Sequence, residues 1–563
     1  MLDLTDPSKK YRCLCEWLSV AKEKAWRLFV GRWTQAEAGR GKNDSEQKMI
    51  WSIRSGKRKR LVILAAFMLG GLVLRLVNCF WGYPYQLHPD EPTIVESAVD
   101  LIHRRSYEAA VYNRPDHFEI KCCAVLFQLV SYLLYGCSAD LSFEMHQTVF
   151  YLTARGFTVL WGTLMIPLGY MLSEKIREGG GLPVSGLVTF HPYFIKHSAY
   201  STPDIVLTFF VMLLAYFSWA YYKKPDSKKL TLMCLITAVG ITIKYTCAIC
   251  LIQIALLVIM KDWGRPASVI RKGFYALAII LAACFFLAPN LFTNIEETIR
   301  TLKFEARSVH PGFDGLGFGG NVWYYINTFF QGTGWEALPF LVAGISITLI
   351  RKKGVLTFPG ATFLICTSAL ALHHERWGLP VYIFLLIWIG LGMAEMMESR
   401  HKGVRGISIV LSIIVGMNIL GLTALQTKVN LAMDSRVEAK AFCDKMGITQ
   451  ENTLYDGYSP LEMKNPKEIE IRLDEEGKLI WPEKTSYLVI SSDMYGRYYA
   501  DQQRFSQQIL KYEEIKRQKR ILGLGGEVNN EHKSFAVENA VNLWGLTKEG
   551  LGGPFLEIFE RLE

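Results

Sequence analysis

The sequence predicts an α-helical polytopic membrane protein of about eleven spans, followed by a small α/β domain at the C-terminal end. Half of the residues are hydrophobic, 13% are aromatic and only 20% are charged. Apolar runs recur at about the 17–25 residues that a helix needs to cross a bilayer. Clusters of lysine and arginine alternate with these runs, as is typical of cytoplasmic loops in membrane proteins.

Basic residues indicate the orientation. The cluster at 57–60 precedes the first span and places the N-terminus in the cytoplasm. Later clusters near 175, 223, 261, 351 and 400 are expected on the same side. The predicted spans lie near 61–81, 148–171, 182–200, 204–222, 230–245, 246–260, 273–289, 334–350, 355–372, 378–396 and 406–425. Because the number of crossings is odd, the C-terminus is expected on the outside. The predicted location is a bacterial cell membrane.

One apolar run, 121–136, does not fit this alternation. If it crossed the membrane, every later basic cluster would lie outside. It is also short for a span. We interpret it as a helix along the outer interface, within a first outer loop at 82–147. The alternative is a true span, compensated by a single crossing at 230–260.

Three parts of the chain differ in composition. Residues 1–60 form a cytoplasmic basic arm, 61–426 the transmembrane domain, and 427–563 the small extracytoplasmic α/β domain. Within the arm, residues 14–29 have the spacing of a basic amphipathic helix, on the inner leaflet or packed on the protein's own loops. Residues 290–333 are expected to form a second, glycine-rich outer loop. The net charge of +10 fits topology and anionic lipids, so no nucleic acid is predicted as a partner.

The 12 cysteines show no spacing typical of a metal site. Cys247 and Cys250 form a Cys-x-x-Cys pair, but within an apolar helix, where small packing residues are the better interpretation.

Carboxylates mark the predicted outer face. Asp90 and Glu91 follow the first span, between Pro89 and Pro92, and Asp204 lies where one span ends and the next begins. A single acidic pair in a loop is usually just solvated. Three carboxylates on one membrane face are instead a candidate catalytic set.

Cationic side chains share this face. These candidate substrate-binding residues are His117 and Lys121 in the first loop, Arg155 in its helix, Lys244 at a helix end and Arg376 before a late span. Ionisable groups in membrane segments tend to face polar cavities, whereas end-of-span cations often extend to lipid headgroups. Contact with lipid headgroups is the better interpretation for Lys121. For Lys244 a polar cavity and lipid headgroups are equally suitable. Arg75, within the first span, has no predicted role.

Carboxylates and cations at a membrane face suit the transfer of a group from a lipid-linked phosphate. A carboxylate can deprotonate an acceptor hydroxyl, and Arg or Lys can stabilise charge on a phosphate leaving group. The lipid tail would stay in the bilayer.

Four motifs, in order, resemble those of GT-C glycosyltransferases, the class of protein O-mannosyltransferases and lipid A aminoarabinose transferases. They are His88-Pro-Asp-Glu91, Thr153-Ala-Arg-Gly, the stretch from Thr189-Phe-His-Pro to Ser201-Thr-Pro-Asp, and Gly240-Ile-Thr-Ile-Lys-Tyr-Thr. The resemblance covers residues 60–425 and implies a GT-C-like fold with interfacial helices in the first outer loop.

The resemblance implies Asp90 as the catalytic base, Glu91 as its neighbour, Asp204 as a second acidic site residue and Arg376 as a ligand of the lipid phosphate. The chain departs from the family at His117-Phe-Glu119, where many members have His-Pro-Pro or Lys-Pro-Pro. This leaves open which of His117, Glu119 and Lys121 serves the site. The family has members with and without a divalent metal, so a metal on Asp90, Glu91 and Asp204 is also left open.

The predicted function is therefore a membrane glycosyltransferase that uses a polyprenyl-phosphate-linked sugar, such as a hexosyl donor, and acts on the outer face. The acceptor would be a protein, lipid or glycan hydroxyl. A membrane transporter or lipid flippase with an acidic outer vestibule is the alternative, for which paired broken helices would argue. A third reading is a scaffold that presents the C-terminal domain.

Overall fold

A computed structural model describes residues 44–305, 314–456, 472–525 and 551–562. The predicted amphipathic helix at 14–29 lies outside these ranges. The chain divides at Val62, and the second unit, Ile63–Glu563, contains the site. Its first helices are α2 (Asp44–Asn78, which begins in the first unit), α3 (Glu91–His103), α4 (His117–Tyr135), α5 (Ala139–Ile176), α6 (Gly181–Phe190), α7 (Pro192–Ser198), α8 (Pro203–Lys223), α9 (Ser227–Ile243), η1 (Tyr245–Ile249), α10 (Cys250–Lys261) and α11 (Pro266–Leu287).

The remaining helices up to the C-terminal region are α12 (Asn290–Thr293), α13 (Ile295–Glu305), α14 (Phe318–Thr333), η2 (Trp335–Ala337), α15 (Leu338–Ile350), η3 (Gly354–Leu356), α16 (Phe358–Ser368), η4 (Glu375–Gly378), α17 (Leu379–Met397) and α18 (Lys402–Leu431). A helix thus occurs at every predicted span, although not every helix is long enough to cross a bilayer.

The described residues contain seven helices that are long and apolar enough to cross a membrane, or eight if a bent pair counts as one span. This composition marks an integral membrane protein, as predicted, but the count is below the expected eleven. One reason is that the predicted span at 182–200 is broken. Pro192 restricts His191 to an extended backbone, with φ −65° and ψ 127°, so α6 ends at Phe190 and α7 begins anew.

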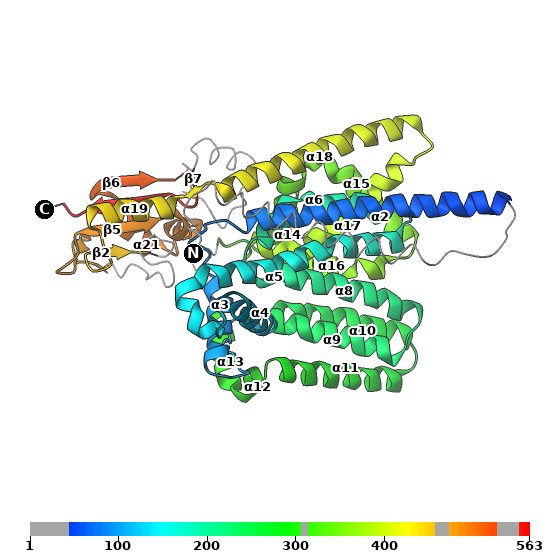
Figure 1. Cartoon of the computed structure of the whole chain (residues 1–563), viewed down its shortest axis with the longest axis horizontal. Coiled ribbons are helices and arrows are strands. Elements are labelled where there is room, and N and C mark those ends of the chain that lie inside the picture. Colours follow the sequence, from blue (N-terminus) through cyan, green and yellow to red (C-terminus); the bar gives the residue numbers. More distant parts are fainter. Residues whose placement is uncertain (1–43, 306–313, 457–471, 526–550, 563) are drawn as a thin grey trace. The chain divides into compact units, whose positions relative to one another are not determined.

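The helix α4 begins four residues before the predicted interfacial run and ends at Tyr135. Figure 1 shows α4 nearly end-on, whereas α2, α5 and α8 lie along the picture plane. One side of α4 is buried, and the other exposes Val125, Leu129 and Leu133. A crosswise helix with an exposed apolar face is expected of an interfacial helix, although α4 is also long and apolar enough to span.

A reporter fused after Gly136 tests this interpretation. If α4 lies along the interface, the reporter should read out on the same side as one fused after Arg105, in the preceding loop. A reporter fused after Lys224, at the other end of α8, should read out on the opposite side and serves as the control. Opposite readouts for the fusions after Arg105 and Gly136 would show that α4 crosses the membrane.

The second predicted loop, 290–333, contains more structure than its glycine content suggested. Besides α12 and α13, it holds α14, which meets the segment Trp335–Ile350 at a bend of 99°. The segment predicted as an outer loop therefore contains helices. Apolar residues of α14, such as Phe329 and Phe330, are buried in the core, and this packing favours the helix.

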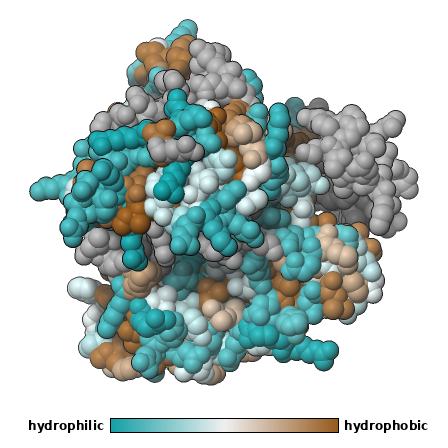
Figure 2. Space-filling model, turned by 90° about the vertical axis from the view of Figure 1, so that its left-hand side faces the viewer, coloured by the Kyte–Doolittle hydropathy of each residue, from teal (hydrophilic) through white to brown (hydrophobic). Residues whose placement is uncertain are grey.

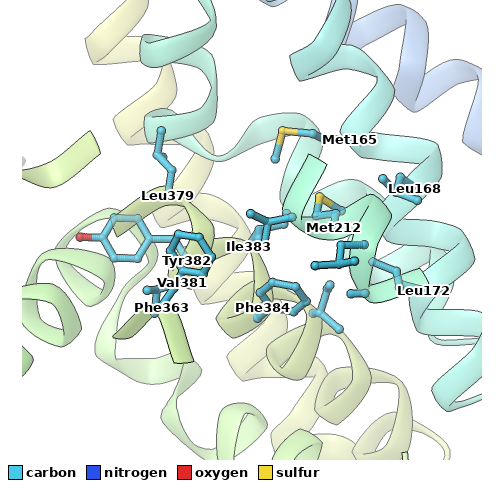
Figure 3. Packing of buried hydrophobic residues seen from close by; sticks show 14 of the residues in the cluster. Met165, Leu168, Leu172, Met212, Phe363, Leu379, Val381, Tyr382, Ile383 and Phe384 are labelled. Carbon is cyan, nitrogen blue, oxygen red and sulfur yellow. The ribbon is translucent and has the colours of Figure 1, made fainter. Parts of the chain in front are cut away.

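The helix α17 lies at the centre of the bundle. In its most apolar window 89% of the residues are buried, compared with 22% for the first span and 17% for α11. Tyr382, Ile383 and Phe384 of α17 pack among residues of α5, α8 and α16 (Figure 3). Arg376 lies in η4, directly before this helix, so the best-packed element of the bundle fixes its position.

The described residues after α18 form an α/β arrangement. Its elements are β1 (Met433–Asp434), α19 (Ser435–Met446), β2 (Thr453–Tyr455), β3 (Arg472–Leu473), β4 (Leu479–Ile480), β5 (Tyr487–Ser491), α20 (Ser492–Tyr495), η5 (Tyr498–Asp501), α21 (Ser506–Lys516), β6 (Lys519–Leu524), β7 (Leu551–Gly552) and β8 (Leu556–Glu560).

Four of these strands form one sheet in the order β2-β5-β8-β6. The β2–β5 pair is parallel, and β8 is antiparallel to both β5 and β6. In this region the sequence predicts a strand at Tyr487–Ser491 and a helix at Asp501–Lys516. Strand β5 occupies the first range, and α21 occupies the later part of the second. The face in Figure 2 shows mainly hydrophilic residues with smaller apolar patches, as expected for a face outside the hydrocarbon of a membrane.

Candidate active site

Asp90 and Glu91 are neighbours in sequence but face different partners. Asp90 is the N-cap residue of α3, and Glu91 is its first helical residue, followed by Pro92. Successive side chains on a helix point about 100° apart, because a turn takes 3.6 residues. Asp90 therefore faces the site, and Glu91 faces the interior of the protein.

The carboxylate of Asp90 lies between two arginines. Its Oδ2 accepts a hydrogen bond from Nη1 of Arg376 and lies 3.0 Å from Nη1 of Arg114. The Asp90 side chain keeps 25% of its surface exposed, so a ligand can reach it. Burial alone would raise the pKa of Asp90, but Arg376 and Arg114 hold this pKa well below its usual range. The stabilisation from these pairs is present above the ordinary aspartate pKa of about 3.9 and is lost only as the pH falls through the lowered value.

Glu91 forms a closed ion pair with Arg155 in the interior. Both joining distances, Nε–Oε1 and Nη2–Oε2, are 2.7 Å, and both side chains are almost fully buried. The backbone N–H of Ser201 also donates to Glu91 Oε1 at 2.9 Å. Burial would raise the pKa of Glu91, but Arg155 lowers it. This geometry gives Glu91 and Arg155 a structural role next to the site.

Asp204, at the start of α8, and Lys244, directly after α9, face Arg376. Asp204, in the first turn of α8, accepts a 2.7 Å bond from Lys244 Nζ, and its second oxygen lies 3.9 Å from Arg376 Nε. Together with Trp377, these residues line a small cavity. The structure thus brings together Asp90, Asp204, Lys244 and Arg376, as the shared membrane face predicted.

Gly240 allows the chain to present Lys244 in this way. Lys244 directly follows α9, and the chain then turns back through η1. A Cβ on Gly240 would lie 2.2 Å from Sγ of Cys247. A larger residue at position 240 would force Cys247 to move, so the Gly240-x-x-x-Lys244 spacing has a steric reason.

Arg114 is a site residue that the sequence analysis did not single out. Besides Asp90, its Nε donates to Asp116 at 2.5 Å, and its Nη2 donates to the backbone oxygen of Asp90 at 3.2 Å. Asp116 adopts a left-handed backbone, with φ 47°, and its N–H bonds Ile243 O next to Lys244. The signal was present as Arg114-Pro-Asp116, in which an arginine and an aspartate flank a rigid turn residue.

The three residues at the point of departure from the family occupy different surroundings. His117 is buried, with Nε2 at 3.1 Å from Val111 O. Lys121 Nζ donates to Leu287 O at the end of α11 and lies 3.3 Å from the centre of the Tyr107 ring, so it serves local packing. Glu119 is buried, and neither of its carboxylate oxygens has a hydrogen-bond partner within the described parts of the chain.

A second polar group, also missed, joins α7 to η4. His197 Nε2 lies 2.7 Å from Glu375 Oε1, and Lys196 Nζ lies 3.6 Å from the same oxygen. Because Glu375 precedes Arg376, these contacts fix the start of α17. Glu375 and Arg376 belong to the stretch His373-His-Glu-Arg, in which the sequence alone predicted no role for Glu375.

The carboxylates do not fit a metal site in this arrangement. Asp90 and Asp204 both face Arg376, and Glu91 is used by Arg155. In the residues that the structure describes, no three His, Cys, Asp or Glu side chains converge as metal ligands. Each of these three carboxylates is instead paired with an arginine or a lysine.

A family model described as dolichyl-phosphate-mannose-protein mannosyltransferase matches residues 139–292. This segment is mannosyltransferase-like. The match confirms the resemblance inferred from the motifs. The mannosyltransferase-like segment contains Arg155, Asp204 and Lys244, whereas Asp90 and Arg376 lie on either side of it. No curated protein matches the chain significantly.

Several solved structures are similar to the chain. ArnT from Cupriavidus metallidurans in the apo state has 13% identity and a TM-score of 0.47, with 79% of this chain and 95% of that chain covered. The Archaeoglobus fulgidus oligosaccharyltransferase in complex with zinc and sulfate has 10% identity and a TM-score of 0.47, with 78% and 69% covered.

The S. cerevisiae protein O-mannosyltransferase Pmt1-Pmt2 complex bound to the sugar donor has 20% identity and a TM-score of 0.34, with 43% of this chain and 34% of that chain covered. Similarity at these levels assigns no donor or acceptor to this chain.

Proposed function

We propose that the chain is a membrane glycosyltransferase that moves a sugar from a polyprenyl-phosphate-linked donor to an acceptor hydroxyl on the outer face of the membrane. The observation that carries this proposal is the reachable Asp90 carboxylate between Arg114 and Arg376. It combines a proton acceptor and two phosphate-binding cations at the end of apolar helices. The match to a mannosyltransferase family supports it.

In this proposal Asp90 is the catalytic base, and Arg376 binds the donor phosphate. The planar guanidinium of Arg376 contacts both Asp90 and Asp204. Arg376 is therefore held next to the base, where it can bind the phosphate. Lys244 and Asp204 position Arg376 and line the cavity beside it. Glu91 and Arg155 hold the start of α3, and therefore Asp90, in place.

Donor binding would also activate the base. Arg376 and Arg114 stabilise the anionic form of Asp90 and make it a weak proton acceptor. A phosphate that takes hydrogen bonds from Arg376 weakens this stabilisation, so the proton affinity of Asp90 rises when the donor is present. The same contact thus binds the phosphate and prepares Asp90 to accept the acceptor's proton.

The structure favours the enzyme over a transporter. A transporter of the inverted-repeat kind would have broken helices in two corresponding positions. Within the described ranges the chain breaks at His191–Pro192 and bends between α14 and Trp335–Ile350, so broken helices alone do not separate the two functions. The acidic residues of the site, however, are paired with cations, so they do not form the open acidic vestibule that the alternative requires.

Purified protein in detergent or liposomes tests the proposal directly. It is incubated with a panel of polyprenyl-phosphate sugars and with hydroxyl acceptors of protein, lipid and glycan type. We expect release of polyprenyl phosphate together with a glycosylated acceptor for at least one pair. Movement of the lipid or sugar across liposomes without bond cleavage would overturn the enzyme and support the transporter.

The substitution Arg376→Lys separates phosphate binding from contact with lipid headgroups. Lysine cannot reproduce the paired hydrogen bonds of a guanidinium, so the donor KM should rise about tenfold or more. The measurement is the dependence of the initial rate on donor concentration. Arg104→Lys is the matched control, because Arg104 pairs with Asp100 on the exposed side of α3. Superimposable curves for wild type and Arg376→Lys would place the phosphate elsewhere.

A further inference from the structure

The region after α18 contacts the loop that carries Asp90. Arg436, in the first turn of α19, donates from Nη1 to the backbone oxygen of Leu87 at 2.9 Å. Leu87 lies three residues before Asp90. The Arg436 side chain is only 6% exposed, so this contact is shielded from water. A charged donor on a backbone carbonyl in such surroundings fixes the path of the loop.

Arg436 is itself held in one orientation. Its Nε and Nη2 donate to the two oxygens of Asp434 at 2.8 and 2.9 Å, and Asp434 also accepts from the backbone N–H of Arg436 at 3.0 Å. Asp434 is buried and is the N-cap residue of α19. This fork-to-carboxylate geometry leaves Nη1 aimed at Leu87.

Strand β7 closes around this pair from a distant part of the sequence. It runs parallel to β1, with Asp434 opposite Gly552. Gly553 has φ +83°, and a Cβ there would lie 2.6 Å from Oδ1 of Asp434. Ser435 Oγ bonds Pro554 O at the same place. The position of Arg436 therefore depends on both ends of the C-terminal region.

The start of the same loop is held by two arginines. The ring of Trp81 has the guanidinium of Arg155 at 5.9 Å and that of Arg436 at 5.6 Å from its centre. Arg155 also donates to the backbone oxygens of Cys79 and Trp81, each at 2.8 Å. The loop from Trp81 to Asp90 is thus fixed by α5 near its beginning and by Arg436 near its end.

We propose that Arg436 is a positioning residue for Asp90, and that the C-terminal region is required for transfer because it supplies this residue. The inference rests on the proposed function of Asp90 as the base. A base must lie within hydrogen-bond reach of the hydroxyl that it deprotonates, and a shift of about 1 Å can cost about 100-fold in rate. The bonds from Arg436 determine where the loop places the Asp90 backbone.

The first measurement needs no activity. Hydrogen–deuterium exchange is followed for the peptide that covers residues 82–90 in wild type, Arg436→Met and Asp434→Asn. Asparagine keeps the cap of α19 but removes the charge that orients Arg436, so this variant is the milder one. We expect faster exchange of the peptide in both variants. The matched control is Arg517→Met, which removes an exposed arginine paired with Glu514 in α21.

The second measurement compares kcat with the donor KM. If Arg436 positions the base, kcat should fall about 10- to 100-fold while the donor KM stays within about twofold, because the phosphate ligands are untouched. Unchanged exchange, or unchanged kcat in folded Arg436→Met and Asp434→Asn proteins, would overturn the inference. A wild type that transfers no sugar would refute the proposed function, whereas the exchange data would still decide whether Arg436 holds the loop.

Discussion

The substitution Asp90→Asn should lower the turnover number by about two to four orders of magnitude, the usual contribution of a general base. An amide can still accept hydrogen bonds from Arg114 and Arg376, so the geometry of the site should persist. It cannot accept a proton from an acceptor hydroxyl. The donor KM should therefore change much less than kcat, since phosphate binding is left to the arginines.

The control for Asp90→Asn is Asp100→Asn, the same change in the same helix. Asp100 pairs with Arg104 at the exposed surface and takes no part in the site. This variant should retain wild-type kinetics. Thermal unfolding of both variants shows whether each protein is folded. Near-normal turnover by a folded Asp90→Asn protein would exclude Asp90 as the base.

The substitution Arg155→Met should give the largest loss of stability. It leaves Glu91 buried without its cation, and breaking a buried ion pair in this way costs about 3–5 kcal/mol. It also removes two hydrogen bonds to the backbone oxygens of Cys79 and Trp81. The measurement is the free energy of unfolding or, in detergent, the shift of the melting temperature.

The matched control is Arg104→Met, which breaks an exposed pair worth about 0–1 kcal/mol. The double variant Glu91→Gln with Arg155→Met should recover part of the lost stability, because no unpaired charge then remains buried. A stable Arg155→Met protein with a raised donor KM would instead support the sequence-based prediction that Arg155 binds substrate.

Part of the site could be predicted because membrane topology restricts where charges lie. Asp90 and Arg376 are 286 residues apart, yet both follow or precede apolar helices at one membrane face, and the structure pairs them. The same reasoning brought in Asp204 and Lys244. The topology assigns each span end to one of two membrane faces. Polar residues at span ends on the same face are therefore expected to lie close together.

Other parts depend on packing, which sequence periodicity does not reveal. Glu91 points away from Asp90 because of the helical rotation at the start of α3, and only the buried partner Arg155 shows its role. Arg114 enters the site through the left-handed turn at Asp116. The break at His191–Pro192 and the helix α14 likewise follow from local chain geometry and from burial in the core, so the eleven predicted spans do not each correspond to one long helix.

The pair of Asp90 and Arg376 also joins two helices with unequal exposure to lipid. Asp90 follows α2, whose apolar window is 22% buried, whereas Arg376 begins the segment of α17, which is 89% buried. Hydrophobic mismatch acts on helices that touch lipid, by tilting them or shifting them along the bilayer normal. A change in bilayer thickness that moves α2 relative to α17 is therefore expected to strain the contact between Asp90 and Arg376, the proposed base and phosphate ligand. The thickness of the surrounding membrane is thereby expected to affect the rate of the proposed transfer reaction.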